Sequence, residues 1–440
     1  MSRCRRLART SGCCARRWSV ADLRLLLVSD HYPPFIGGAH RQTQLLAHEL
    51  AARGHDIHVA TQWHGGMSRR EVSGGVVVHR VRQLRTAVRA LVRDTNQRQS
   101  PPFPDPVSIW DLRAVLREAR PQVVHSYGWL TFSIAAALVG KRVPLIVSAR
   151  DYGYFCATRT FLQNGRQPCA GPAPGKCLSC ATAYYGAPKG WIAAAGVAAC
   201  RPLLRRKLTG IHSVSRYMHD VSAQHVSGAR DAAIQVIIPS FQARAPDEPA
   251  RGDAAVEHVL AQLPAEPFIL FVGPLRRIKG VEVLFEAHAR LRLPTPPLVL
   301  IGLVGHDAPR RVPADATVIV DAPHAAVLAA WDRALFGVMP SLWPEPLGAV
   351  VAEAMSRGRA VIGTRLGGHA EMLDESCGVL VPQGDVAALA AAMQALVDDP
   401  QRRDALGAAA RARARDFTAE TIVPRFEQTY RDLLAVAART

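Results

Sequence analysis

Short apolar runs alternate with helix-like segments along nearly the whole chain, and this alternation constrains the fold more than any other feature. It is typical of βαβ units, in which helices connect parallel strands and pack on the sheet. Proline and polar residues at 244–251 separate two series of such units, so we expect two doubly wound, Rossmann-like α/β domains. The expected strands are Leu23–Ser29, Ile57–Thr61, Val123–Ser126, Leu145–Ser148, Ile211–Val214 and Val236–Ile238, then Phe268–Val272, Leu298–Ile301, Thr317–Val320, Phe336–Met339 and Ala360–Ile362.

The length of 440 residues also favours two domains, because one hydrophobic core rarely serves so long a chain. We expect a first domain over 22–243, a linker over 244–266, a second domain over 267–415 and a last helix over 416–440. Helices are expected at Gln44–Arg53, Val281–Leu291, Ala325–Arg333 and Leu347–Arg357, and from Asp385 to about Ala438 with breaks near Asp399–Pro400 and Asp416–Thr418.

Residues 1–21 contain six arginines and no acidic residue, and we expect them to form a disordered basic tail. The tail holds no apolar run of the length found in signal peptides, so we expect a cytoplasmic protein. No later run approaches the roughly 20 apolar residues of a membrane-spanning helix.

Basic residues outnumber acidic ones by 54 to 36, which gives a net charge of +18. Such an excess is typical of proteins that meet an anionic partner, and we consider peripheral attachment to an anionic membrane; a merely solubilising surface is the alternative. We expect no nucleic acid partner, because aromatic residues make up only 6% and no basic stretch is interleaved with stacking side chains.

Three loops follow predicted strands, where parallel α/β sheets bind their ligands. The first, over 31–39, contains Gly37 and Gly38. Glycines there allow backbone to approach an anionic ligand at a helix N-terminus, although they also serve simply to turn the chain.

The second loop, over 271–280, places Lys279 immediately before a predicted helix. A cation at that position, assisted by Arg276 or Arg277, would neutralise a diphosphate leaving group. The alternative is an ordinary basic surface loop.

The third loop, from Pro340 to Glu353, carries the strongest signal. Glu345 stands in a proline-rich loop, and we expect a helix to begin at Leu347. The amides of Leu347 and Gly348 would then face a phosphate, because the first N–H groups of a helix lack partners within it. Glu353 would lie about 9 Å further along the axis, at 1.5 Å per residue. One carboxylate would bind a hexose and the other a ribose; solvated side chains are the alternative.

With these residues the chain resembles the retaining glycosyltransferases of family 4, from about Leu23 to the C-terminus. In that family two glutamates separated by seven residues mark the donor site, and Glu345 and Glu353 match them. The resemblance implies the GT-B fold, in which two Rossmann-like domains face each other across a cleft. It further implies that Glu353 binds the ribose and Glu345 the donor hexose.

The resemblance also implies contacts between the donor phosphates and Gly38, Lys279 and the amides of Leu347 and Gly348. Gly368, within the segment 367–371, matches another glycine loop near the donor. The last helix would cross back onto the first domain, and no cofactor is implied for catalysis.

The sequence departs from the family at two positions. Pro274 stands where an arginine is common, so Arg276 or Arg277 would have to replace that phosphate contact. Arg150 stands where many members carry a histidine near the reacting carbon. Arginine cannot act as a base, but it can polarise a substrate oxygen or hold a phosphate. His125, on a neighbouring strand, is a second catalytic candidate, with a structural role as its alternative.

Cys156, Cys169, Cys177 and Cys180 lie in a segment rich in glycine and proline. Four thiols that include one C-x-x-C pair are typical of a structural zinc site, and disulfides or free thiols are the alternatives. The cluster follows Arg150 closely, so we expect it to shape the acceptor pocket.

We therefore expect an enzyme that transfers a hexose from a UDP- or GDP-sugar to a glycolipid or polysaccharide acceptor. Retention of the anomeric configuration is implied by the resemblance. The alternatives are a sugar-nucleotide epimerase of the same fold and a non-catalytic, zinc-stabilised module that binds a sugar nucleotide or nucleic acid.

Overall fold

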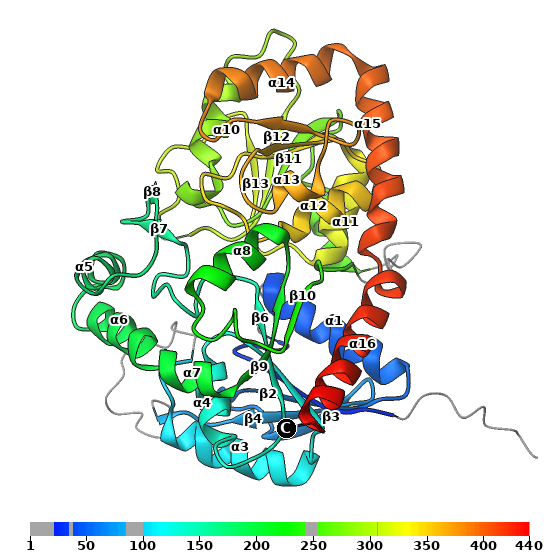
Figure 1. Ribbon diagram of the computed structural model, residues 1–440. Helices are drawn as coiled ribbons and strands as arrows, with labels where there is room; N and C mark the ends of the chain where they lie inside the picture. Colours follow the sequence, from blue (N-terminus) through cyan, green and yellow to red (C-terminus); the bar gives the residue numbers. More distant parts are fainter. Residues whose placement is uncertain (1–21, 35–37, 85–99, 243–252, 306, 440) are drawn as a thin grey trace, which may run out of the picture.

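The computed structural model describes residues 22–34, 38–84, 100–242, 253–305 and 307–439, and these residues form two α/β lobes (Figure 1). The predicted α/β fold with two parallel sheets is confirmed. The predicted tail, Gly37 and residues 244–252 of the predicted linker lie outside the described residues.

The first domain is built on a sheet with eight described strands in the order β10-β9-β6-β5-β1-β2-β4-β3. Only β3 runs antiparallel to its neighbour, and its hairpin with β4 was not expected from the sequence. Leu25, Leu26, Leu27 and Val28 of β1 are almost completely buried because both faces of this central strand are covered. The strands are β1 Arg24–Ser29, β2 Asp56–Gln62, β3 Arg70–Ser73, β4 Val76–Val81, β5 Val123–Tyr127, β6 Leu145–Ala149, β9 Leu208–Ser213 and β10 Ile234–Ile237.

Helices cover both faces of this sheet. The first of them begins at Gly38, six residues before the predicted start at Gln44. The helices are α1 Gly38–Ala52, α3 Pro106–Ala119, α4 Leu130–Ala137, α6 Lys189–Ala199, α7 Arg201–Lys207 and α8 Arg216–His225.

A small insertion follows β6 and projects beside the gap between the lobes (Figure 1). It consists of a hairpin of β7 (Leu162–Gln163) and β8 (Gln167–Pro168), followed by helix α5 (Pro174–Tyr185). Within α5 only Ala181 is buried, so the insertion has little hydrophobic core of its own.

The second domain has six described parallel strands in the order β13-β12-β11-β14-β15-β16. Its strands are β11 Phe268–Val272, β12 Leu298–Ile301, β13 Thr317–Ile319, β14 Ala334–Met339, β15 Val361–Thr364 and β16 Val379–Val381. Its helices are α9 Ala254–Leu260, η2 Arg277–Lys279, α10 Val281–His288, α11 His324–Arg333, α12 Ala349–Ser356, α13 His369–Met372, α14 Val386–Asp398, α15 Pro400–Arg413 and η3 Ala414–Phe417.

The last helix, α16 (Ala419–Ala437), leaves the second domain and packs on the first, as Figure 1 shows in red. Its residues Ile422, Phe426 and Tyr430 are completely buried and share a core with Leu25 and Leu27 of β1. The first domain therefore includes residues from the end of the chain.

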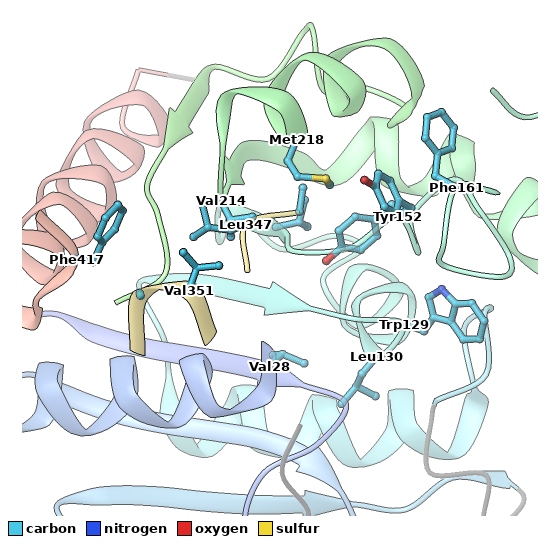
Figure 2. Close-up of a cluster of buried hydrophobic side chains, with 14 of the residues drawn as sticks. Val28, Trp129, Leu130, Tyr152, Phe161, Val214, Met218, Leu347, Val351 and Phe417 are labelled. Carbon is cyan, nitrogen blue, oxygen red and sulfur yellow. The ribbon is translucent and has the colours of Figure 1, made fainter. Parts of the chain in front are cut away.

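A buried apolar cluster joins the two domains. Figure 2 shows Leu347 and Val351 of the second domain in one cluster with Val214, Met218 and Tyr152 of the first. Among the described residues, no helix combines the length and the apolar character needed to cross a bilayer.

Candidate active site

Glu345 and Lys279 form the centre of the candidate site. Lys279 Nζ donates to Glu345 Oε1 over 2.5 Å, and Ser341 Oγ and Trp343 Nε1 donate to the same oxygen over 2.7 Å each. Glu345 Oε2 receives no hydrogen bond from the described residues. The carboxylate is thus fixed through one oxygen, Oε1.

Backbone contacts hold these two loops together. Gly280 has φ +74°, and a Cβ there would lie 1.9 Å from the carbonyl oxygen of Pro340, so only glycine allows this approach. Leu342 N–H donates to the carbonyl of Ile278 over 2.8 Å. The segment around Lys279 is therefore tied to the one that carries Glu345.

The predicted glycine segment 367–371 closes the other side of the loop. Gly368 N–H donates to the carbonyl of Glu345 over 2.7 Å, and Glu345 and Gly367 form a parallel β-bridge. The next residue, His369, is buried, and its Nδ1 has no hydrogen-bond partner within the part of the chain that the structure describes. Gly368 thus supports the Glu345 loop through its backbone.

Electrostatics keep Glu345 ionised and His369 neutral. Burial raises the pKa of Glu345, but the charge of Lys279 and the hydrogen bonds from Lys279 and Ser341 outweigh burial, and the net result is a lowered pKa. Burial lowers the pKa of His369 to about 4, although Glu345 opposes that shift. The site thus pairs one carboxylate with one ammonium group beside an uncharged imidazole.

Helix α12 begins at Ala349, so the predicted start at Leu347 was wrong. The reason is Gly348, whose φ of +90° is left-handed and cannot continue a right-handed helix. The Leu347 side chain is buried in the interdomain cluster (Figure 2). The amides of Ala349 and Val350, in the first turn, have no partner within the helix and point out of its N-terminus.

Glu353 is buried on α12 and takes part in a chain of contacts between the domains. Arg41 Nη2, on α1, lies 2.8 Å from His324 Nδ1, and His324 Nε2 lies 2.9 Å from Glu353 Oε1. Because arginine only donates, Nδ1 must accept, and Nε2 carries the proton that Glu353 receives. Glu353 Oε2, like that of Glu345, has no partner among the described residues.

The sequence reasoning missed Arg41, His324, Ser341 and Trp343 as members of the site. Ser341 and Trp343 lie within the same loop as Glu345, so the sequence could have predicted that they lie close to its carboxylate. Arg41 and His324 come from different domains, and no local pattern links them.

Arg276 was predicted to act beside Lys279, but its side chain contacts Asp307 and Tyr184 instead. Its Nε donates to Asp307 Oδ1 over 2.8 Å, and its Nη2 lies 3.4 Å from Tyr184 Oη of the insertion. Of the two glycines predicted in the first loop, Gly38 is the first residue of α1, and Gly37 is not described.

His125 lies in a buried chain of hydrogen bonds. His212 Nε2 donates to the Ile238 carbonyl over 2.7 Å, so His212 Nδ1 accepts from Ser148 Oγ over 2.7 Å. Ser148 Oγ in turn accepts from His125 Nε2 over 2.7 Å, and Tyr430 Oη of α16 lies 2.8 Å from His125 Nδ1. Neither ring nitrogen of His125 is therefore available to a substrate.

Arg150 follows β6 and is buried among the same elements. Its Nη1 donates to Ser240 Oγ over 3.2 Å. It also lines a small pocket together with His125, Tyr127 and Thr43. The structure thus places Arg150 and His125 side by side in the first domain.

The four cysteines of the insertion line one pocket. Backbone amides donate to two of the sulfurs over 3.3 Å each, from Asn164 to Cys180 and from Ala173 to Cys177. All four are free thiols. Among the described residues, however, no group of three or more His, Cys, Asp or Glu side chains has the geometry to hold a metal ion.

Two further contacts close the domains over the site. Tyr152 Oη, which follows β6, donates to the carbonyl of Pro344 over 2.5 Å, and Ser215 Oγ donates to that of Pro346 over 2.6 Å. Both acceptors flank Glu345. The first domain therefore contacts the loop that carries the central carboxylate.

Two protein families match the chain. Residues 37–240 match the glycosyl transferase 4-like domain, and residues 259–413 match the glycosyl transferases group 1. Glycogen synthase of Mycobacterium tuberculosis H37Rv is 29% identical over 445 residues, which cover 93% of this chain and 94% of that protein. A D-inositol 3-phosphate glycosyltransferase of Pseudarthrobacter chlorophenolicus is 35% identical over 161 residues, covering 34% of this chain and 38% of that enzyme.

Solved structures show the same architecture. Sucrose-phosphate synthase from Thermosynechococcus elongatus has a TM-score of 0.69 at 22% identity and covers 94% of this chain and 99% of its own. Anabaena HepE in complex with UDP-glucose has a TM-score of 0.63 at 17% identity and covers 93% and 99%. Two facing Rossmann-like domains, an acid pair on one loop and helix, and matches to both domains identify the chain as a nucleotide-sugar glycosyltransferase of family 4 with the GT-B fold.

Proposed function

We propose that the protein transfers a hexose from a UDP- or GDP-sugar to a glycolipid or polysaccharide acceptor, with retention of the anomeric configuration. The observation that carries this proposal is the arrangement of Glu345, Lys279 and Glu353 around the N-terminus of α12. Each acid is held through Oε1 and leaves Oε2 for a ligand.

The charges of these groups suit the cleavage of a bond between a sugar and a diphosphate. That cleavage builds negative charge on the diphosphate, and Lys279 and the first-turn amides of α12 would stabilise it. Glu345 Oε2 would accept a hexose hydroxyl and Glu353 Oε2 a ribose hydroxyl. In a retaining reaction the acceptor attacks on the face from which the diphosphate leaves, and the diphosphate takes the acceptor's proton.

Relatives support the donor class more than the acceptor. HepE was solved with UDP-glucose, and starch synthase IV of Arabidopsis thaliana was solved with ADP and acarbose. The curated relatives are named for different products, glycogen in one and an inositol phosphate glycoside in the other. The nucleotide and the acceptor of this chain are thus questions for binding and transfer assays.

Calorimetric titration with UDP, GDP and their sugars tests the donor assignment. We expect one nucleotide to bind, and Glu353→Ala to weaken its affinity by about 2–5 kcal/mol, because a buried charged contact loses one partner. Glu282→Ala, an exposed acid on α10, is the matched control and should bind normally. Equal affinity in Glu353→Ala and the wild type would refute the ribose assignment. Product analysis with donor alone distinguishes transfer from epimerisation.

A glycolipid acceptor would place the protein at a membrane surface, and the net charge of +18 favours an anionic one. Flotation with phosphatidylglycerol-containing vesicles at low and high salt tests this part of the proposal. Binding that falls as salt rises supports it, and equal binding to neutral vesicles contradicts it.

A further inference from the structure

Two arginines are buried in the first domain, and they differ in their partners. Arg159 lies between two carboxylates: its Nε donates to Asp151 Oδ2 over 2.9 Å, and its Nη1 lies 3.8 Å from Asp30 Oδ2. Burial alone would lower the pKa of Arg159, but the nearby negative groups raise it. The charge of Arg159 is therefore compensated within the protein.

Arg150 lacks such compensation. It is 7% exposed, and its one hydrogen bond with the described residues goes to Ser240. No carboxylate of the described residues forms an ion pair with it. The groups that act on its charge are the hydroxyls of Tyr127, Tyr430 and Tyr154, and burial lowers the pKa of Arg150 to about 10.

A buried guanidinium with five N–H donors and one protein acceptor is costly to the folded state. The imidazoles beside it do not provide negative charge. Burial and then Arg150 itself lower the pKa of His125 to about 3, and they also lower that of His212. Such an arrangement is expected where a bound anion supplies the missing partner.

The position of Arg150 agrees with a ligand site. Its pocket is lined by Val28 of β1, Thr43 of α1 and His125 and Tyr127 of β5. These residues gather at the carboxyl ends of parallel strands, where open α/β sheets bind ligands.

The pocket also lies close to the proposed donor site. Ser240, the partner of Arg150, is two residues from Gln242, whose Nε2 donates to the carbonyl of Ala349 over 3.1 Å. Two residues span at most about 7 Å. The segment that contacts Arg150 therefore reaches the N-terminus of α12.

We propose that Arg150 binds an anionic group, phosphate or carboxylate, of the acceptor substrate. This inference rests on the proposed function, since it assigns the first domain to the acceptor. The donor diphosphate is a less suitable partner, because Lys279 and the first-turn amides of α12 already face it from the second domain. Phosphate and carboxylate both match the planar guanidinium through two parallel hydrogen bonds.

The first test compares stability without substrate, with Arg159 as the matched control. Arg150→Met removes an unpaired buried charge, and we expect the Tm to rise by about 2 °C. Arg159→Met removes the cation that compensates the carboxylates of Asp30 and Asp151, and it should lower the Tm. Added inorganic phosphate should raise the Tm of the wild type with UDP present and leave that of Arg150→Met unchanged. A phosphate effect of equal size in both proteins would overturn the proposal.

The second test measures UDP release with matched acceptors: glucose, glucose 6-phosphate and glucuronate. We expect the kcat/KM of a charged acceptor to exceed that of glucose by roughly 10- to 100-fold. Preference for glucose 6-phosphate would identify the anionic group as phosphate, and preference for glucuronate would identify it as carboxylate. Arg150→Met should abolish this preference, and Arg150→Lys should restore part of it. Equal use of charged and neutral acceptors by the wild type would overturn the proposal.

UDP affinity separates this inference from the proposed function. Unchanged UDP binding in Arg150→Met is expected, whereas a loss there would assign Arg150 to the donor diphosphate and overturn the inference. Absence of UDP and GDP binding in the wild type would instead refute the proposed function.

Discussion

Three side chains donate hydrogen bonds to one oxygen of Glu345, and these bonds fix the orientation of its carboxylate. Lys279, Ser341 and Trp343 hold Oε1, so the carboxylate cannot turn when a ligand arrives. Under the proposed function, a fixed carboxylate next to a fixed ammonium group would be pre-organised for a transition state in which sugar and diphosphate separate.

Replacement of Lys279 tests this arrangement. We expect Lys279→Met to lower kcat by about 10²- to 10³-fold, because the leaving diphosphate loses its nearest cation. Steady-state assays of UDP release provide the measurement. Arg277→Met, which removes an exposed cation two residues away, is the control and should retain activity. Equal losses in both variants would indicate a general charge effect.

Buried histidines make the folded state sensitive to acid. Burial is the first cause that lowers the pKa of His125 to about 3 and the pKa of His79 and His369 to about 4. Below pH 6.5 the unfolded chain binds these protons and the folded chain does not, so stability falls as pH decreases toward 4. Each such histidine costs about 1.4 kcal/mol per pH unit in that window.

Denaturant unfolding from pH 7 to pH 4.5 measures this loss. His125→Asn should reduce the dependence of unfolding free energy on pH, whatever its effect at pH 7. His258→Asn, at an exposed position on α9, should not change that dependence. A wild-type stability that is constant over this range would contradict the neutral state of the buried histidines.

At the scale of elements, the predicted breaks in the last helical stretch illustrate what sequence signals achieve. Asp399 caps α15 by accepting a hydrogen bond from Arg402 N–H, and Pro400 occupies the first helical position. Two adjacent residues therefore predict the break between α14 and α15. Helix α4 carries no such pattern, because nearly all its residues are buried and show no polar face. The start of α12 was misplaced because the left-handed Gly348 is set by packing against His369.

The insertion contains four cysteines and has little hydrophobic core of its own. We expect one zinc ion per chain, held by Cys156, Cys169, Cys177 and Cys180 after the thiols draw together, and lost in Cys177→Ser. Elemental analysis of the purified protein measures the metal. Cys200→Ala, which alters a thiol of the core outside the insertion, is the control and should keep the zinc.

Thiol titration under denaturing conditions distinguishes the alternatives. If the protein contains no metal and these four thiols react without reductant, the prediction of a zinc site is refuted. Four unreactive sulfurs that appear only after reduction would indicate disulfides instead.

At the scale of the whole molecule, hydrogen bonds join the two domains, so the structure is a closed form. Glu371 of the second domain accepts from the N–H groups of Arg216 and Tyr217, over 2.7 Å each, at the N-terminus of α8. Arg41 and His324 form a second link that ends on Glu353. The two doubly wound domains were predictable from local patterns, but these links join residues distant in sequence and required the structure.

Loss of Glu371 should favour an open form. Glu371→Ala removes two charge-assisted hydrogen bonds, each about 1.5–3 kcal/mol, and should increase the radius of gyration in small-angle scattering. We also expect a higher KM for the donor. Glu375→Ala, an exposed acid nearby, should leave both quantities unchanged. An unaltered radius of gyration in Glu371→Ala would show that other contacts maintain closure.

The position of α16 has a consequence for synthesis of the protein. The apolar face of the first sheet that receives Phe426 and Tyr430 is covered only in part, by Leu46 and Leu50 of α1, until the ribosome has translated α16. Although N-terminal domains usually fold first during translation, the core of this one is completed only when the nineteen-residue helix α16 has been made. A premature stop codon shortly before Ala419 would therefore remove part of the core around Leu25 and Leu27, near the beginning of the chain.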